Sequence, residues 1–163
     1  MIESVKKEQL PACLDILKQS YENTAVKFGM TEENCPYRGR TRLPYQVFEN
    51  EFQAGNLMYG YMIQNRIVGF LSLIVEKKEM HINDIAVLPA YQNRGIGSKL
   101  MQFARVKANE LGCSKICLGM VYDNAPLRNW YQEFGFKTVN LVKFEKVDYT
   151  VGKMEFILSP PIH

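Results

Sequence analysis

The chain has 163 residues, which is enough for one domain with a substantial core and too few for two ordinary domains. Hydrophobic residues make up 47% of the chain and charged residues 23%, a balance that excludes a disordered or fibrous protein. The formal net charge is only +3 and no block of five like charges occurs, so the sequence predicts no nucleic-acid partner.

The apolar segments are too short for a membrane-spanning helix. The longest run, residues 67–75, contains Gly69 and Ser72 and cannot cross a bilayer. The first residues show no apolar stretch followed by a cleavage site, so we expect a cytoplasmic protein without a membrane partner. The four cysteines form no Cys-x-x-Cys pair, and only His81 and His163 accompany them. This spacing favours reduced, packed cysteines and predicts no metal site.

In chain order, the first half predicts a strand, two helices and a hairpin. Residues 2–5 form the short strand, and apolar residues then recur at helical spacing over 10–21. After an irregular stretch, a second helix over 44–55 begins near a proline and ends near a glycine. Strand-forming residues fill 56–63 and 66–75, and the Gln64-Asn65 step between them predicts a tight turn.

The second half predicts an alternation of strands and helices. A strand over 80–88 ends near a proline, and an amphipathic helix over 96–111 leads to a strand over 115–121. Because a helix connects these two strands, we expect them to be parallel. A short helix capped by Asp123 or Asn124 ends at Gly135 and precedes strands at 136–144 and 151–158. The sequence therefore predicts a single α/β domain over residues 1–163 with a mixed sheet.

The segment Gln92-Asn93-Arg94-Gly95-Ile96-Gly97, between a predicted strand and a predicted helix, carries the most specific chemistry of the chain. Its two glycines let the backbone approach a ligand closely, and the first N–H groups of the helix have no partner within it. The helix dipole adds about half a positive charge. The turn therefore suits a phosphate or pyrophosphate group.

The spacing of this segment argues against two other nucleotide-binding turns. A Walker A loop requires Gly-Lys followed by Ser or Thr, whereas Gly97 is followed by Ser98 and then Lys99. A dinucleotide fingerprint requires a third glycine at position 100, which is a leucine here. The pattern that remains is Val87-x-Pro89-x-x-Gln92-x-x-Gly95-x-Gly97.

This pattern resembles the acetyl-CoA signature of the GCN5-related N-acetyltransferase (GNAT) superfamily. A second segment, Asn124-x-x-x-x-x-x-Tyr131-x-x-x-Gly135-Phe136, resembles another part of the family pattern. The resemblance is strongest over residues 81–137, and the order of strands extends it loosely to most of the rest. It implies a single-domain α/β fold with a mixed, mostly antiparallel twisted sheet, a central parallel strand pair and flanking helices.

The resemblance implies acetyl-CoA as the cosubstrate. The strand at Ile85–Val87 would pair with the peptide-like pantetheine arm, and the glycine turn would surround the pyrophosphate. Arg94 and Lys99 would add positive charge near the phosphates, although each is equally well explained as a solvated surface charge. The residues expected to bind the coenzyme are Ile85, Ala86, Val87, Gln92, Asn93, Arg94, Gly95, Ile96, Gly97, Ser98, Asn124 and Tyr131.

Two residues are candidates for catalysis. Tyr131 matches the family tyrosine that approaches the coenzyme sulfur and can donate a proton to it, and Asn124, seven residues earlier, would face the same side of a helix. Tyr131 also lies on the apolar stripe, so core packing is its alternative role. Asp84, an acid in an apolar strand, is the leading candidate for the base, because burial would raise its pKa. A structural or substrate-binding role for Asp84 stays open, and His81 is a weaker candidate for the base.

The acceptor is expected to contact residues 28–52, because in this family the helical region before the hairpin forms the acceptor side. The alternating Arg38, Arg40 and Arg42 of this region could attract an acidic group, but such a charge run is typical of a solvated face, which is the interpretation that we favour. The sequence thus predicts direct transfer of an acetyl group from the thioester to a primary amine of a small molecule or peptide. A non-catalytic acyl-CoA-binding sensor is the alternative. A homodimer is compatible with the sequence, which does not specify an oligomeric state.

Overall fold

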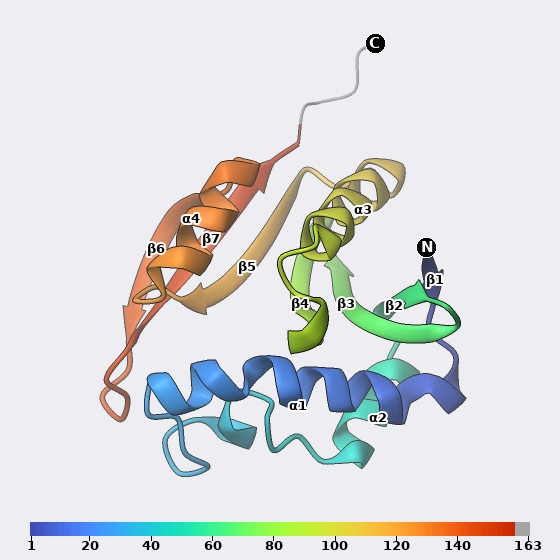
Figure 1. The fold of residues 1–163 in the computed structure, drawn as a ribbon. Helices are drawn as coiled ribbons and strands as arrows, with labels where there is room; N and C mark the ends of the chain where they lie inside the picture. The colour runs from blue at the N-terminus through green and yellow to red at the C-terminus, as the bar shows by residue number, and fades with distance from the viewer. Residues whose placement is uncertain (159–163) are drawn as a thin grey trace.

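Seven strands form one mixed sheet in the computed structural model, which describes residues 1–158 (Figure 1). His163 and the end of the predicted 1–163 domain lie outside the described residues. The order of strands across the sheet is β1-β2-β3-β4-β5-β7-β6. The strands are β1 (Ile2–Ser4), β2 (Leu57–Ile63), β3 (Arg66–Glu76), β4 (Glu79–Val87), β5 (Lys115–Val121), β6 (Lys137–Lys143) and β7 (Thr150–Ile157).

Helices cover both faces of the sheet. The α-helices are α1 (Leu10–Lys27), α2 (Tyr45–Gln53), α3 (Ile96–Glu110) and α4 (Ala125–Phe134). Short 3₁₀ turns occur at Lys7–Gln9, Pro36–Arg38 and Pro89–Tyr91. Figure 1 shows α1 and α2 together beneath the sheet, with α3 and α4 beside its strands. Every residue of β3 from Ile67 to Leu73 is buried, as expected for a strand covered on both faces.

Packing around β3 shows how the two helical layers meet the sheet. Gly69 lies against Ile96 and Leu100 of α3, so closely that a side chain there would meet both. The next residue, Phe70, points to the other face and packs edge-on against Phe48 of α2, with ring centroids 5.6 Å apart. Successive strand residues alternate between faces, so a single strand supplies the core on both sides.

The predicted fold is confirmed. Each helix and strand expected from the sequence is present, although α1 continues to Lys27, beyond the periodic segment at 10–21. β4 and β5 are parallel, as the helical connection predicts, and the other neighbouring strands are antiparallel. None of the helices in residues 1–158 is long and apolar enough to cross a membrane.

Two irregularities in β4 shape the region that follows. Parallel pairing with β5 ends at the His81–Cys117 pair, after which the two strands separate. In the pairing with β3, Ser72 lies opposite Asp84 and Leu73 opposite Ile82, so Asn83 is the extra residue of a β-bulge. Bulges re-aim side chains next to functional sites. The separation opens a gap in the sheet, and the bulge lies at its edge.

Candidate active site

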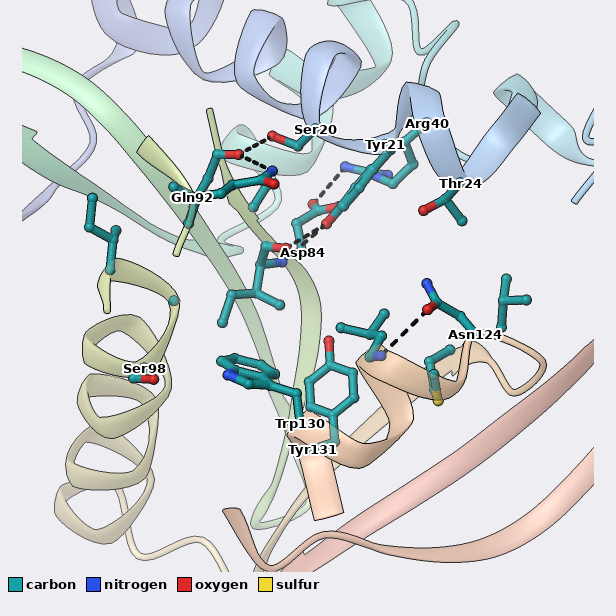
Figure 2. Close-up of a pocket in the computed structure, with 18 of the residues that line it drawn as sticks. Ser20, Tyr21, Thr24, Arg40, Asp84, Gln92, Ser98, Asn124, Trp130 and Tyr131 are labelled. Atoms are coloured by element: carbon teal, nitrogen blue, oxygen red, sulfur yellow. Dashed lines mark hydrogen bonds and ion pairs between the residues drawn. The ribbon is translucent and has the colours of Figure 1, made fainter. Parts of the chain in front are cut away.

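A cleft of about 560 Å³ lies where β4 and β5 separate, and α1, α3, α4 and the loops before α2 and α3 contribute to its walls (Figure 2). Most of the residues predicted to act or bind line it. They are Asp84, Ile85, Ala86, Val87, Gln92, Asn93, Gly95, Ile96, Gly97, Ser98, Asn124 and Tyr131. Their convergence on one cavity makes this cleft the candidate active site, while their binding and catalytic roles stay predictions.

Two of the predicted phosphate contacts, Arg94 and Lys99, do not line this cleft. Arg94 stacks over Tyr91, 5.2 Å from the ring centroid, and lines a neighbouring cavity of about 400 Å³ with Arg66. Lys99 Nζ donates to the Tyr61 hydroxyl on β2 at 3.3 Å. The helix end supplies partial positive charge at the turn itself, and the contribution of Arg94 and Lys99 stays a prediction.

The glycine turn begins α3 and exposes its first backbone groups to the cleft. Gly95 immediately precedes the helix with φ +81°, a left-handed conformation that favours glycine. A Cβ added at Gly97 would lie 3.3 Å from the Trp130 ring of α4, so a larger residue would push into the wall of the cleft. The turn thus keeps its backbone accessible in the way that an anionic ligand requires.

The free edge of β4 is held by side chains where β5 no longer pairs with it. The Tyr21 hydroxyl of α1 donates to the Ile85 carbonyl oxygen at 3.1 Å and accepts from the Ile85 N–H at 3.2 Å. Ser20 Oγ and Gln92 Nε2 both donate to the Val87 carbonyl oxygen, at 2.8 and 3.0 Å. Buried backbone groups need such partners, and these three side chains take the place of a neighbouring strand.

Asp84 belongs to a buried cluster with two partners from the segment before the hairpin. Its side chain is fully buried, and Arg40 contacts both carboxylate oxygens: Nε lies 2.7 Å from Oδ1 in an ion pair, and Nη2 donates to Oδ2 at 2.9 Å. Arg40 also donates to both oxygens of Glu51 on α2, at 2.9 and 3.2 Å. One guanidinium therefore joins two carboxylates, which its fork of donors suits.

The bulge at Asn83 completes this cluster. Neighbouring residues of a regular strand point to opposite faces of the sheet. Here the Asn83 amide donates to Glu51 Oε1 at 3.1 Å and to Asp84 Oδ2 at 3.3 Å, so both side chains reach the same group of charges. The bulge thus turns two adjacent polar residues toward one end of the cleft.

The electrostatics of Asp84 reflect burial first. Burial raises the pKa of the Asp84 carboxyl to about 7, because the loss of hydration outweighs the attraction of the Arg40 guanidinium. The pKa of Arg40 is raised as well, since Asp84 and Glu51 offset its own burial, and the guanidinium stays charged. A carboxyl with a pKa near neutrality can exchange a proton under ordinary conditions, as the sequence predicts for a buried acid.

The interpretation of the three arginines as a solvated face is wrong for two of them. Arg38 binds both oxygens of Glu22 on α1, at 2.9 and 2.8 Å, and is largely buried. Arg40 lines the cleft, and only Arg42 is exposed. The left-handed backbone at Arg40, with φ +76°, is a feature of this irregular loop that a sequence pattern does not reveal.

Tyr131 points from α4 into the cleft, toward the side on which Asp84 lies (Figure 2). Its ring packs edge-on against Trp130 and Phe136, so the packing role and the cleft-lining position coexist. Burial raises the pKa of the Tyr131 phenol well above its ordinary value, and the group therefore keeps its proton. Asn124 precedes the helix rather than lying within it: its Oδ1 accepts from the Leu127 N–H as an N-cap.

Sequence reasoning missed the contribution of α1. Ser20, Tyr21 and Thr24 line the cleft, whereas the acceptor side was expected from residues 28–52, of which only Gly39 and Arg40 do so. Tyr21 falls at the same helical spacing as the core leucines, which hides its polar role. The one available signal was that position 21 carries a hydroxyl where its periodic neighbours are leucines.

Comparisons with known proteins agree with this geometry. The model of the "Acetyltransferase (GNAT) family" matches residues 16–136, which include most of the cleft. An "Uncharacterized N-acetyltransferase in pepI 3'region" from Lactobacillus delbrueckii subsp. lactis is 23% identical over 169 residues, covering 97% of this chain and 95% of the relative.

Solved structures share the fold at low sequence identity. The ribosomal-protein-S18-alanine N-acetyltransferase from Escherichia coli superimposes with a TM-score of 0.80 at 18% identity, covering 99% of this chain and 95% of that one. The PaiA N-acetyltransferase from Thermoplasma acidophilum, solved in complex with coenzyme A, gives a TM-score of 0.76 at 17% identity, covering 97% and 98%. The chain therefore belongs to the acetyltransferase (GNAT) family and is an N-acetyltransferase.

Proposed function

We propose that this protein transfers the acetyl group of acetyl-CoA directly to a primary amine in the cleft between β4 and β5. One observation carries the proposal. A buried carboxyl with a pKa of about 7, Asp84, and a protonated phenol, Tyr131, line the same cavity as an accessible helix N-terminus. Transfer from a thioester to an amine requires a proton acceptor, a proton donor and a site for the coenzyme phosphates, and these residues supply all three.

The coenzyme would lie along the free edge of β4 with its pyrophosphate at the start of α3. The backbone groups of Ile85 and Val87 are the strand groups that amides of the pantetheine arm would meet. Tyr21, Ser20 and Gln92 already satisfy them, so binding would exchange a side-chain partner for a coenzyme partner. At the start of α3, the proposed pyrophosphate site depends on Gly95 and Gly97, which leave the helix N-terminus uncovered.

The proposed reaction has a balanced proton count. The acceptor ammonium gives one proton to Asp84, and the freed nitrogen lone pair attacks the thioester carbon. A carbon–nitrogen bond forms, the carbon–sulfur bond breaks, and the sulfur leaves with the proton of Tyr131. The second proton of the amine passes to solvent, solvent restores the proton of Tyr131, and Asp84 releases its proton to solvent before the next turnover. Asp84 and Tyr131 therefore act on the entering and the departing group, respectively.

The proposed acceptor class rests on the charge of the Asp84, Arg40 and Glu51 cluster, of which Asp84 and Arg40 line the cleft. With both acids ionised, Asp84 and Glu51 exceed the single charge of Arg40 by one negative unit. An alkylammonium group is attracted to such a site, and an anionic group is disfavoured. We propose a primary amine of a small molecule or of a peptide; the Escherichia coli neighbour, named for an alanine of a ribosomal protein, justifies testing peptide N-termini beside small amines.

The test is a screen of amine acceptors by release of the CoA thiol. The panel contains polyamines, aminoglycosides, amino acids and peptides with a free N-terminus, each with acetyl-CoA and with no acceptor. The proposal predicts that at least one amine accelerates thiol release and gains one acetyl group by mass spectrometry. Tight CoA binding without acceleration by any amine would instead support the non-catalytic sensor.

A further inference from the structure

A second group of reactive side chains lies on the paired part of β4 and β5, and none of its members lines the cleft. Glu79 and His81 of β4 and Cys117 of β5 each present one potential metal ligand, and the three ligand atoms lie within 4.8 Å of one another. Glu79 and His81 are partly exposed, so a solvated ion can reach them. The proposed acetyl transfer uses none of the three.

The strand register explains why these residues meet. His81 is the parallel partner of Cys117, and Cys117 is the antiparallel partner of Glu155 on β7, so the three form one row across the sheet. Glu79 and its partner Lys115 form the next row. Because residues two apart on a strand share a face, both rows present their side chains on the same side. The pairing of the strands therefore brings these residues together, and the cluster does not depend on chance contacts between surface side chains.

We propose that His81, Cys117 and Glu79 form a binding site for a divalent transition metal of the zinc class. Imidazole, thiolate and carboxylate are all established zinc ligands, and bonds of about 2.0 to 2.3 Å at tetrahedral angles place neighbouring donors roughly 3.3 to 3.8 Å apart. His81 Nε2 and Glu79 Oε2 are already 3.7 Å apart. Three protein ligands leave the fourth position to water.

Two further residues determine how the site would load. The Cys117 thiol lies 3.8 Å from Glu155 Oε2, and burial raises the pKa of the thiol to about 11, so a bound metal must displace its proton. The Lys115 ammonium lies between the carboxylates, 2.6 Å from Glu155 and 3.5 Å from Glu79. A dication at Glu79 competes with this ammonium. Lys115 is thus expected to weaken the site, which gives the proposal a distinctive test.

The experiment titrates the full-length protein with cobalt(II) and reads the absorption band that arises only when a thiolate coordinates the ion. Added zinc should remove the band, because zinc binds such a site more tightly than cobalt. We expect saturation at one cobalt per protein and no band in Cys117→Ser. The matched control is Cys35→Ser, which removes another partly exposed cysteine and should retain the band. Lys115→Met should bind zinc about tenfold more tightly than the wild type.

Far-ultraviolet circular dichroism shows whether Cys117→Ser is folded. If it is not, His81→Gln decides the question, because this side chain is 43% exposed and its loss should leave the fold intact while weakening zinc binding at least tenfold. A wild type without the thiolate band at excess cobalt would overturn the proposal. So would a band that survives in folded Cys117→Ser, or zinc affinity that is unchanged in His81→Gln.

Discussion

Arg40 changes the chemistry of Asp84 more than any other residue does. The two are 44 positions apart, and folding brings the guanidinium against both carboxylate oxygens in a buried environment. Without this partner, burial would hold Asp84 in its neutral form to still higher pH, because desolvation disfavours the charged form. Arg40 therefore keeps the proposed base usable near neutral pH while Glu51 anchors the guanidinium from α2.

We predict that replacing Arg40 by Met moves the acidic limb of the kcat/KM profile to higher pH. In the wild type the rate should rise with pH through about 7, as Asp84 loses its proton. An opposite charge at this distance typically lowers a carboxyl pKa by about 1 to 3 units, so its loss should move the midpoint upward by a similar amount. The measurement is kcat/KM at on the order of ten pH values between pH 5 and pH 9.

Two controls accompany the Arg40 variant. Arg42→Met removes a neighbouring exposed arginine and should leave the midpoint in place, and Arg40→Lys retains the charge and should move it less. Asp84→Asn should abolish the limb altogether. An unmoved midpoint in folded Arg40→Met, or a persistent limb in Asp84→Asn, would assign the base to another group or to water.

At this scale the sequence predicts the acid but not its partner. Asp84 is conspicuous because it interrupts an apolar strand, and its burial follows from that position. The inward turn of Arg40 depends on a loop whose left-handed residues follow no periodic pattern. Charged residues in a loop are usually solvated, so the rule that holds for Arg42 fails for Arg40 because a tertiary partner is present.

The N-terminus of α3 is the element on which coenzyme binding depends. Its glycines keep the backbone open, and α4 places Trp130 directly beside the first turn. Sequence spacing predicts this turn well, because a strand, a pair of glycines and a helix are all local features. The neighbouring positive side chains were less predictable: Arg94 lies over Tyr91 and Lys99 over Tyr61, and neither charged side chain lines the cleft.

We predict that Gly97→Val weakens CoA binding at least tenfold, which is about 1.4 kcal/mol. The added Cβ would meet Trp130 at 3.3 Å, and the branched side chain would cover the backbone groups of the first turn. Calorimetry measures the affinity. Gly112→Ala strains the other end of the same helix, where φ is +70°, and should leave the affinity unchanged. Undiminished CoA binding by Gly97→Val would exclude the turn as the phosphate site.

The free edge of β4 is the second element with a testable role. Where β5 no longer pairs with β4, the backbone groups on that edge of β4 form hydrogen bonds with Tyr21 and Ser20 of α1 instead. This exchange was not predictable from periodicity, because Tyr21 occupies a position that helical spacing assigns to the core. It depends on where β4 and β5 separate, which only the assembled sheet determines.

Tyr21→Phe should destabilise the free protein by about 1 to 3 kcal/mol, because the Ile85 N–H and carbonyl lose their partner. Affinity for CoA should not fall, since the coenzyme can satisfy the same backbone groups. Urea unfolding gives the stability and calorimetry gives the affinity. Tyr45→Phe, which removes an exposed hydroxyl, serves as the control for both. A weaker CoA complex in Tyr21→Phe would indicate that the hydroxyl contacts the coenzyme directly.

At the scale of the whole molecule, one sheet brings together residues from most of the chain. The cleft takes Tyr21 from α1, Arg40 from the loop before α2, Asp84 from β4 and Tyr131 from α4. Local patterns predict each helix and strand and the parallel β4–β5 pair, because hydrophobic periodicity and turn residues are local. Clusters assembled by strand register are not local, which is why the spacing of His81 and Cys117 along the chain gave no indication that they meet.

The expected cellular location and binding partners of the protein stay predictions. The sequence predicts a cytoplasmic protein with no nucleic-acid partner, and the helices of residues 1–158 include none long and apolar enough to cross a membrane. Light scattering, which measures the molar mass in solution, would show whether the protein forms a homodimer. The absence of a metal site, predicted from cysteine spacing, is the expectation that the convergence of Glu79, His81 and Cys117 now calls into question.

The central claim, acetyl transfer to an amine in this cleft, is tested most directly by comparing the wild type with Tyr131→Phe under identical conditions. The measurement is acetylated amine formed per CoA released, by mass spectrometry and thiol assay, with the best acceptor from the screen. We predict equal amounts of both products, and turnover roughly 10- to 1000-fold lower in Tyr131→Phe with little change in CoA affinity or melting temperature. Thiol release without acetylated amine, or equal turnover in the two proteins, would contradict the account.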